Sequence, residues 1–272
     1  MSGTSERGTR APSDRGTTFV RNTSVVIERG LRVGKRAGIA MLISGLADPV
    51  FYFILFALVI GRSLSAQSGY ASQPSYGAYI LPGLLTVSAM NAATYEATWG
   101  VYFRMRYSGV YKSMLSTPLS ATNIVLGEIV LGAMRGMLYA AVFCAFAVCL
   151  GLITWTFLVP ALAGSSLVAA AFTGAGMAFS TNIRTLQQMD WLSFILLPLF
   201  LFSGALYPIS VYPVGLQLVI KSFPLWQSIE LVRGLETTPW TFQLILRGCY
   251  VAVLGAAGAI IARRGLVRYF AD

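Results

Sequence analysis

The sequence predicts an all-α polytopic membrane protein with six transmembrane helices, an N-terminal amphipathic helix at the interface, and short outer-leaflet helices before the last span. Of its 272 residues, 56% are hydrophobic and 11% are charged, whereas a soluble domain carries roughly 25% charged residues. The mean hydropathy is +0.69. Six apolar runs approach or exceed the roughly 18–20 residues that a spanning helix needs. They cover residues 38–61, 79–103, 123–150, 158–180, 191–208 and 242–262.

The segments that flank these runs complete the predicted domain organisation. Residues 1–22 are rich in Gly, Ser, Thr and Arg, so we expect a disordered cytoplasmic tail. They lack the apolar core of a signal peptide. Apolar and basic residues alternate over 23–36, a pattern typical of a helix that lies on the bilayer surface. The permease domain then covers 37–262, and 263–272 form a second cytoplasmic tail.

The distribution of charge predicts the orientation of the chain. There are 20 Lys and Arg residues against 10 Asp and Glu residues. With six spans, fifteen of the basic residues fall on the side of the two termini, and the opposite side has only Arg62, Lys221 and Arg233. The positive-inside rule therefore places both termini in the cytoplasm. No groove-reading or RNA-binding motif accompanies the basic residues, so we expect no nucleic-acid partner.

The outer segment from Tyr207 to Trp240 is long and half apolar. Pro208, Pro213, Pro224 and Pro239 divide it into pieces too short to span a bilayer. We therefore expect paired short helices that dip into the outer leaflet or lie along it, around an exit for substrate. Aromatic side chains that favour the membrane interface accompany them: Tyr207, Tyr212, Phe223, Trp226 and Trp240. Anchoring alone explains these aromatics equally well.

Composition also limits the chemistry of the chain. There is no His, and the three Cys residues form no zinc or disulfide pattern. No convincing nucleophile and base pair is present, so we expect neither a catalytic residue, a metal site nor a bound cofactor. No nucleotide-binding motif occurs, and any ATP would therefore be bound by a separate subunit.

Ionisable residues inside the apolar runs are candidates for function, because each is costly at membrane depth. These are Asp48, Glu96, Glu128, Arg135 and Arg247. Asp48 precedes a proline, so it can cap a half-helix. Glu96 and Glu128 lie at matching depths and predict a polar cluster near the inner gate. This cluster either holds helices together or lines a substrate path.

Arg135 lies seven residues after Glu128, on the same helix face but about 10 Å further along the axis. A direct pair between them would need bent side chains, so we expect Arg135 to face either the cluster or the central route. Gly132 and Gly136 in the same run form a small-xxx-small pair, which favours a close helix contact. In a chain with 27 Gly residues, chance is an equally good explanation.

Several ordered motifs resemble the nodulation-type lipo-oligosaccharide export permeases, the NodJ type, within the type-2 ABC exporter family and related to daunorubicin-resistance permeases. The first motif is the Leu46–Tyr52 segment, and the second run supplies Tyr79–Gly83 and Ser88–Glu96. The others are Phe103–Arg106, Met114–Leu119, Gly127–Val130, Phe202–Pro208 and Pro224–Arg233. Arg135 and the Val211–Tyr212 stretch depart from the family pattern.

The resemblance implies a permease subunit of a bacterial inner-membrane ABC exporter. Such a subunit forms a homodimer, works with a separate cytoplasmic ATPase, and moves a lipo-oligosaccharide, a glycolipid or an amphiphilic drug outward. It also implies that the 104–122 loop contains the helix that docks on the ATPase, through Arg104, Arg106, Tyr111, Lys112, Met114 and Leu115. An ordinary basic loop is the alternative for this segment. Six basic-inside spans would equally fit a channel or an ion-coupled carrier.

Overall fold

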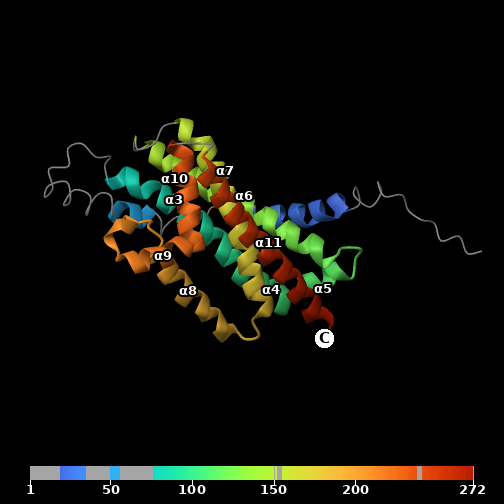
Figure 1. Cartoon of the computed structure of the whole chain (residues 1–272). Helices are drawn as coiled ribbons and strands as arrows, with labels where there is room; N and C mark the ends of the chain where they lie inside the picture. Colours follow the sequence, from blue (N-terminus) through green and yellow to red (C-terminus); the bar gives the residue numbers. More distant parts are fainter. Residues whose placement is uncertain are drawn as a thin grey trace, which may run out of the picture.

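The computed structural model describes residues 19–34, 50–55, 76–149, 151, 155–237 and 241–271, and the regular elements within these ranges are all helical (Figure 1). The labelled helices follow one another in the order α3 (Tyr76–Tyr95), η2 (Glu96–Gly100), α4 (Val101–Arg106), α5 (Val110–Leu115), α6 (Ala121–Cys149), α7 (Trp155–Asn182), η3 (Leu186–Met189), α8 (Asp190–Leu201), η4 (Ile209–Val211), α9 (Val214–Ser222), α10 (Pro224–Thr237) and α11 (Phe242–Ala271). Asp48, Trp240, residues 62–75 and most of the first apolar run lie outside the described residues.

Helices α6 and α7 pack closely because glycine lines their contact. A Cβ atom at Gly132 would lie 1.8 Å from Thr173 Oγ1, and one at Gly136 would lie 2.1 Å from the Ala169 Cβ. Both distances are far below van der Waals contact, so only glycine fits at either position. The predicted small-residue contact is therefore confirmed, with α7 as the partner helix.

Helix α11 packs on α7 in the same manner and runs the length of the bundle. A Cβ at Gly258 would lie 2.4 Å from the carbonyl carbon of Gly174. The helix does not end at residue 262, where the sequence predicted a tail, but continues to Ala271. Gly265 and Leu266 are buried in this extension, and a Cβ at Gly265 would meet Thr181 Oγ1 at 2.5 Å. Packing on the end of α7 thus explains why residues 263–271 are helical.

The fifth apolar run is not a single helix over 191–208. Helix α8 ends at Leu201, and the chain then turns through Gly204, whose φ of +73° favours glycine. The Tyr79 hydroxyl donates to the Gly204 carbonyl at 3.2 Å, and a Cβ at Gly83 would lie 2.9 Å from the Ala205 Cα. The turn is therefore held against α3. In Figure 1, α8 extends away from the other long helices.

The outer segment contains short helices, η4, α9 and α10. Helix α10 is part of the bundle rather than a surface element, since Leu225, Ile229 and Val232 are all fully buried. Helix α9 is more exposed and contributes Ile220 to the interior. The segment thus combines one helix that packs among α3, α7 and α11 with one that lies beside them (Figure 1).

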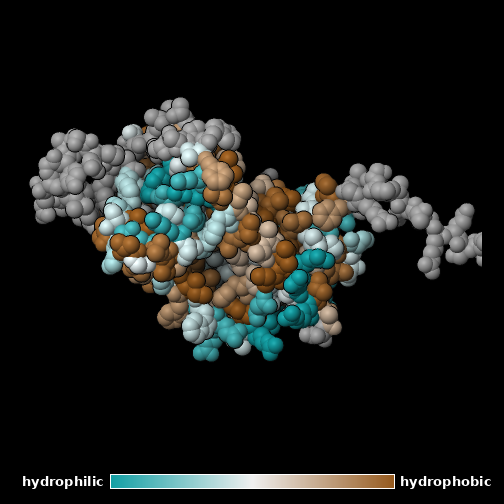
Figure 2. All heavy atoms as spheres, viewed as in Figure 1, coloured by the Kyte–Doolittle hydropathy of each residue, from teal (hydrophilic) through white to brown (hydrophobic). Residues whose placement is uncertain are grey.

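Three of the described helices are long and apolar enough to cross a membrane: Ala121–Cys149, Phe157–Asn182 and Phe242–Ala271. The shorter helical stretch Leu186–Leu201 is also apolar. The number of six spans therefore stays a prediction. In Figure 2, hydrophilic residues gather over α10 and near the labelled C terminus of Figure 1, and a hydrophobic band separates the two zones. This distribution suits a protein whose middle faces lipid.

The amphipathic N-terminal helix covers 19–34, so it begins inside the predicted disordered tail. Val26 is fully buried, and a Cβ at Gly127 of α6 would lie 2.6 Å from its Cγ1 atom. Asn123 Nδ2 donates to the Phe19 carbonyl at 3.1 Å and to Thr23 Oγ1 at 3.0 Å. These contacts with α6 explain why residues 19–22, which were predicted to be disordered, are helical. They attach its apolar face to the end of the bundle that holds α5.

Candidate functional site: two charged clusters

The first charged cluster, called here the inner network, consists of Glu96, Arg104, Tyr111, Glu128 and Arg135. Glu96 opens the π-helical turn η2 that joins α3 to α4. A Cβ at Gly100 would lie 2.5 Å from Glu96 Oε1, so glycine at this position leaves space for the carboxylate to fold along the helix. π-turns inside α-helices are frequent at functional sites.

Arg104 joins the two carboxylates of the inner network. Its Nη1 atom lies 2.6 Å from Glu96 Oε1, and its Nη2 atom lies 3.0 Å from Glu128 Oε2. Arg135 reaches Glu96 Oε1 from the next helix at 2.9 Å. The sequence did not determine the partner of Arg135. In the structure, Arg135 pairs with Glu96 rather than with Glu128.

Tyr111 completes the inner network from α5. Its side chain is fully buried, and its hydroxyl donates to Glu128 Oε1 at 2.9 Å and accepts from Arg104 Nε at 3.2 Å. Burial, and then the charge of Glu128, raise the pKa of Tyr111 well above its ordinary value. The phenol therefore stays protonated and keeps its donor at any physiological pH.

The four charges of the inner network balance. Two carboxylates face two guanidinium groups, and each charged side chain is at most 22% exposed. Removing one member would leave a partner uncompensated in a largely buried place, which is far more costly than losing the pair. The network therefore links η2, α4, α5 and α6.

The residues expected to dock on an ATPase separate into two groups. Arg104 and Tyr111 face the inner network, and Met114 is 8% exposed and packs in the core. Leu115 packs on that core from a half-buried position. Only Lys112 of this set is exposed on α5, next to Ser113.

Arg106 has a role in holding helices together. Its Nη2 atom donates to the Ile183 carbonyl at 2.6 Å, and its guanidinium lies 4.9 Å from the centre of the Tyr269 ring. It thereby connects α4 to the end of α7 and to the end of α11.

The sequence contained a signal for the pair of Arg104 with Glu96, because their spacing of eight residues is close to two helical turns.

The second charged cluster, called here the outer cluster, has Glu230 of α10 at its centre. Arg233 Nη1 lies 2.6 Å from Glu230 Oε1, and Arg247 Nη1 of α11 lies 3.5 Å from Oε2 and donates to the Glu230 carbonyl at 3.1 Å. Both guanidinium groups also cover aromatic rings, at 4.4 Å from Tyr79 and 5.5 Å from Trp226. Of these residues, sequence reasoning singled out only Arg247 and Trp226 as candidates.

The predicted exit residues differ in their exposure and in their contacts. Trp226 and Phe223 are half-buried, and Tyr207 is 42% exposed. Tyr212 packs on Phe202 with 5.9 Å between ring centres, and its hydroxyl donates to the Leu201 carbonyl at 3.4 Å. Trp226 contacts the guanidinium group of Arg247, and Tyr212 closes the turn after α8.

The two clusters lie at opposite ends of α11. Arg247 is near its start, and Tyr269, which contacts Arg106, is near its end. The 22 residues between them correspond to about 33 Å at the rise of an α-helix. This distance matches the roughly 30 Å hydrocarbon thickness of a bilayer.

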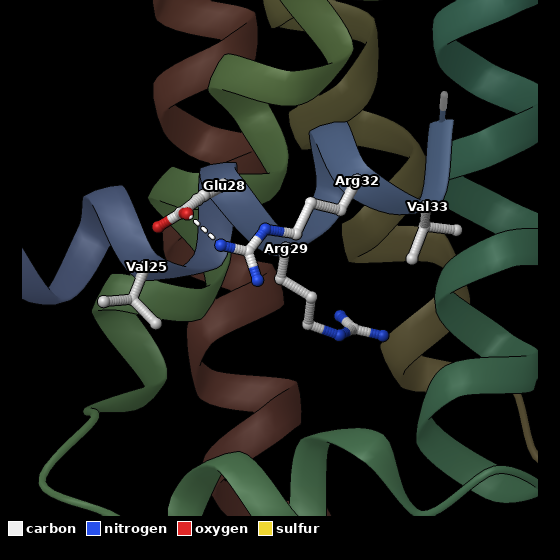
Figure 3. Close-up of a pocket in the computed structure, with 5 residues that line it drawn as sticks. All are labelled: Val25, Glu28, Arg29, Arg32 and Val33. Atoms are coloured by element: carbon white, nitrogen blue, oxygen red, sulfur yellow. Dashed lines mark hydrogen bonds and ion pairs between the residues drawn. The ribbon is translucent and has the colours of Figure 1, made fainter. Parts of the chain in front are cut away.

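A shallow pocket of about 290 Å³ lies on the N-terminal helix (Figure 3). Val25, Glu28, Arg29, Arg32 and Val33 line it, and Arg32 pairs with Glu28 one turn earlier. Arg29 has no ion pair among the described residues. The pocket thus combines valine side chains with a basic group, as expected for a helix at a membrane interface.

The chain is similar to known membrane transport proteins over most of its length. Residues 21–237 match the family model described as "ABC-2 type transporter". Nodulation protein J of Rhizobium leguminosarum bv. viciae is 31% identical over 252 residues, which are 91% of this chain and 96% of the relative. Nodulation protein J of Rhizobium meliloti is 29% identical over 78% of this chain and 80% of the relative. The inner membrane transport permease YadH of Escherichia coli is 24% identical over 72% of this chain and 71% of the relative.

Proposed function

Because the chain belongs to the ABC-2 type transporter family, we propose that it is the permease subunit of an exporter that moves a lipid-like substrate out of a bacterial cell. The similarity to nodulation protein J favours a lipo-oligosaccharide or another glycolipid, and an amphiphilic drug is the related possibility. A separate ATPase subunit binds ATP and supplies the energy. The permease itself needs no cofactor.

The proposed topology has six spans in the plasma membrane, with both termini in the cytoplasm. Two features support the orientation of this topology. The exposed basic residues Arg263, Arg264 and Arg268 lie at the end of α11 that is nearest the inner network. The outer cluster then lies on the opposite side, about one bilayer thickness away.

One observation carries the proposed coupling to an ATPase: the short helix α5 is exposed on one face and hydrogen-bonded to the inner network on the other. Lys112 and Ser113 are on the exposed face, and Tyr111 on the buried face contacts Arg104 and Glu128. An ATPase that docks on the exposed face would therefore displace the ion pair between Arg104 of α4 and Glu128 of α6. In this proposal the network transmits ATP-driven motion to the spans.

The test reverses charge on the exposed face and leaves the network intact. The Lys112→Glu/Ser113→Glu variant, co-expressed with its ATPase, is expected to insert normally and to lose stimulated ATP hydrolysis and transport. Arg184→Glu is the matched control, because Arg184 is exposed in the α7–η3 loop beside the same end of the bundle. Full stimulation in the Lys112→Glu/Ser113→Glu variant would refute the docking site. Ion conduction by the purified chain alone would favour the channel instead.

We also propose that the permease forms a homodimer, with α8 as part of the contact. Its Trp191, Phe194 and Leu197 side chains are 64%, 71% and 59% exposed. An apolar helix this exposed needs lipid or another subunit around it. Oxidative cross-linking of the Phe194→Cys variant tests this, with Val253→Cys on α11 as the equally exposed comparison at 67%. Cross-linking of both variants to the same degree would argue against α8 as the contact.

A further inference from the structure

A pocket of about 370 Å³ lies beside the outer cluster, where α9, α10 and α11 meet. Its volume is within the range of about 300–1,000 Å³ that is typical of small-ligand sites. Three helices line it: Lys221 comes from α9, Trp226 and Gln227 come from α10, and Gln243, Leu246, Arg247 and Tyr250 come from α11. The site therefore depends on the packing of elements from two parts of the sequence.

Hydrogen bonds hold the walls of this pocket together. The Tyr250 hydroxyl of α11 donates to the Ser222 carbonyl at 2.8 Å, and Gln227 Nε2 donates to the Lys221 carbonyl at 2.7 Å. Both acceptors belong to the last turn of α9, whose carbonyls would otherwise lack partners. The end of α9 is thereby fixed, and it places Lys221 at the edge of the pocket.

The charges around the pocket do not balance. Arg233 and Arg247 share the single carboxylate of Glu230, and Lys221 adds a third cation without an ion pair among the described residues. Two positive charges are therefore uncompensated among the side chains that the structure describes here. The inner network, with two carboxylates and two guanidinium groups, is neutral by comparison.

Arg247 has hydrogen-bond donors to offer a ligand. Only its Nη1 atom pairs with Glu230, and no described residue accepts a hydrogen bond from its Nε or Nη2 atoms. A guanidinium with two free donor nitrogens suits the bidentate binding of a phosphate. Leu246 in the pocket and Val253 two turns further along α11 are 53% and 67% exposed. They offer an apolar strip on which an acyl chain can lie.

We propose that this pocket binds the phosphate headgroup of an anionic amphiphile in the outer leaflet. Arg247 and Lys221 contact the phosphate, Gln227 and Gln243 contact neighbouring polar groups, and the acyl chain follows the exposed face of α11. The leaflet assignment rests on the topology proposed above. The amphiphile is either a resident membrane phospholipid or an exported molecule with an anionic headgroup on its way out.

The test measures which lipid lies next to Trp226. The full chain is reconstituted into phosphatidylcholine nanodiscs that contain a minor fraction of a lipid with brominated acyl chains. The signal of Trp226 is the difference in fluorescence quenching between the unmodified chain and Trp226→Phe. Brominated phosphatidylglycerol is expected to quench Trp226 more strongly than brominated phosphatidylcholine at the same mole fraction. Equal quenching by the two lipids would overturn the proposal.

Charge variants show whether the pocket causes the preference. Lys221→Gln and Arg247→Gln are each expected to weaken the selectivity for phosphatidylglycerol by about fivefold. Lys221 is exposed, so its replacement keeps the test valid even if Arg247→Gln lowers the folded yield. Arg263→Gln/Arg264→Gln removes two exposed cations from the other end of α11 and is the control without effect. Unchanged selectivity in Lys221→Gln would overturn the proposal.

Mass spectrometry of co-purified lipids distinguishes the two sources. Loss of phosphatidylglycerol from the Lys221→Gln/Arg247→Gln variant identifies a resident phospholipid, and loss of a different anionic amphiphile identifies the exported molecule. The same lipids on both proteins would contradict the site. The nanodiscs of the quenching experiment hold no ATPase, so the quenching result does not depend on whether the chain exports anything.

Discussion

Tyr111 of α5 donates a hydrogen bond of 2.9 Å to the carboxylate of Glu128 on α6. This bond joins a six-residue helix with an exposed outer face to a helix long enough to span a membrane. A movement of α5 therefore cannot leave the ion pair of Glu128 with Arg104 unchanged.

Replacing Tyr111 with Phe removes the donor and keeps the packing of the ring. Glu128 Oε1 then lacks its hydroxyl partner in a buried place, which costs about 1–3 kcal/mol. We expect a lower unfolding temperature in detergent together with reduced ATPase stimulation. Tyr102→Phe is the control, since Tyr102 is also buried but contacts Arg106 through its ring. Normal stimulation in Tyr111→Phe would show that the hydroxyl takes no part in coupling.

Glu96 and Arg135 should respond unequally to substitution. In Arg135→Met, Glu96 keeps its pair with Arg104, whereas Glu96→Gln removes the only carboxylate that pairs with Arg135 among the described residues. Glu96→Gln should therefore lower the folded yield more than Arg135→Met does. A double-mutant cycle should give a coupling energy of about 0.5–3 kcal/mol. Additive effects would mean that the two side chains do not interact in the membrane.

Gly132→Ala should destabilise the bundle, because the new Cβ would lie 1.8 Å from Thr173 Oγ1 of α7. Overpacking of this kind typically costs about 1–3 kcal/mol. Gly215→Ala in α9 is the matched control, since no atom lies within 4 Å of its Cβ position. The measurement is the thermal unfolding of both variants in the same detergent. Equal unfolding temperatures would contradict the close packing of α6 and α7.

Single cysteines in α9 and α10 should react with a water-soluble maleimide in a helical pattern. Positions 218 and 219 are exposed and should be labelled from outside, whereas 220, 225 and 229 are fully buried and should not. The experiment uses a chain in which the exposed Cys149 and Cys249 are replaced by Ser. Uniform labelling would indicate a solvated loop, and labelling only from inside would reverse the proposed topology.

Sequence reasoning located most helices because hydrophobic length and proline positions are local signals. The runs at 123–150 and 158–180 became α6 and α7 within a few residues of their predicted ends. The run at 191–208 did not become one helix, because the turn at Gly204 depends on α3 and on Trp226, which are distant in the sequence. The extension of α11 to Ala271 depends likewise on a contact with Thr181.

The sequence by itself determined that this chain belongs in a membrane, which of its charges lie inside apolar runs, and the family that its motifs resemble. Those properties follow from composition and order along the chain. Only the tertiary structure decided that Arg104 bridges Glu96 and Glu128, that Tyr111 joins them, and that Glu230 lies between Arg233 and Arg247. The physical reason is that an ion pair depends on a few ångströms between side chains of different helices, and helix packing sets that distance.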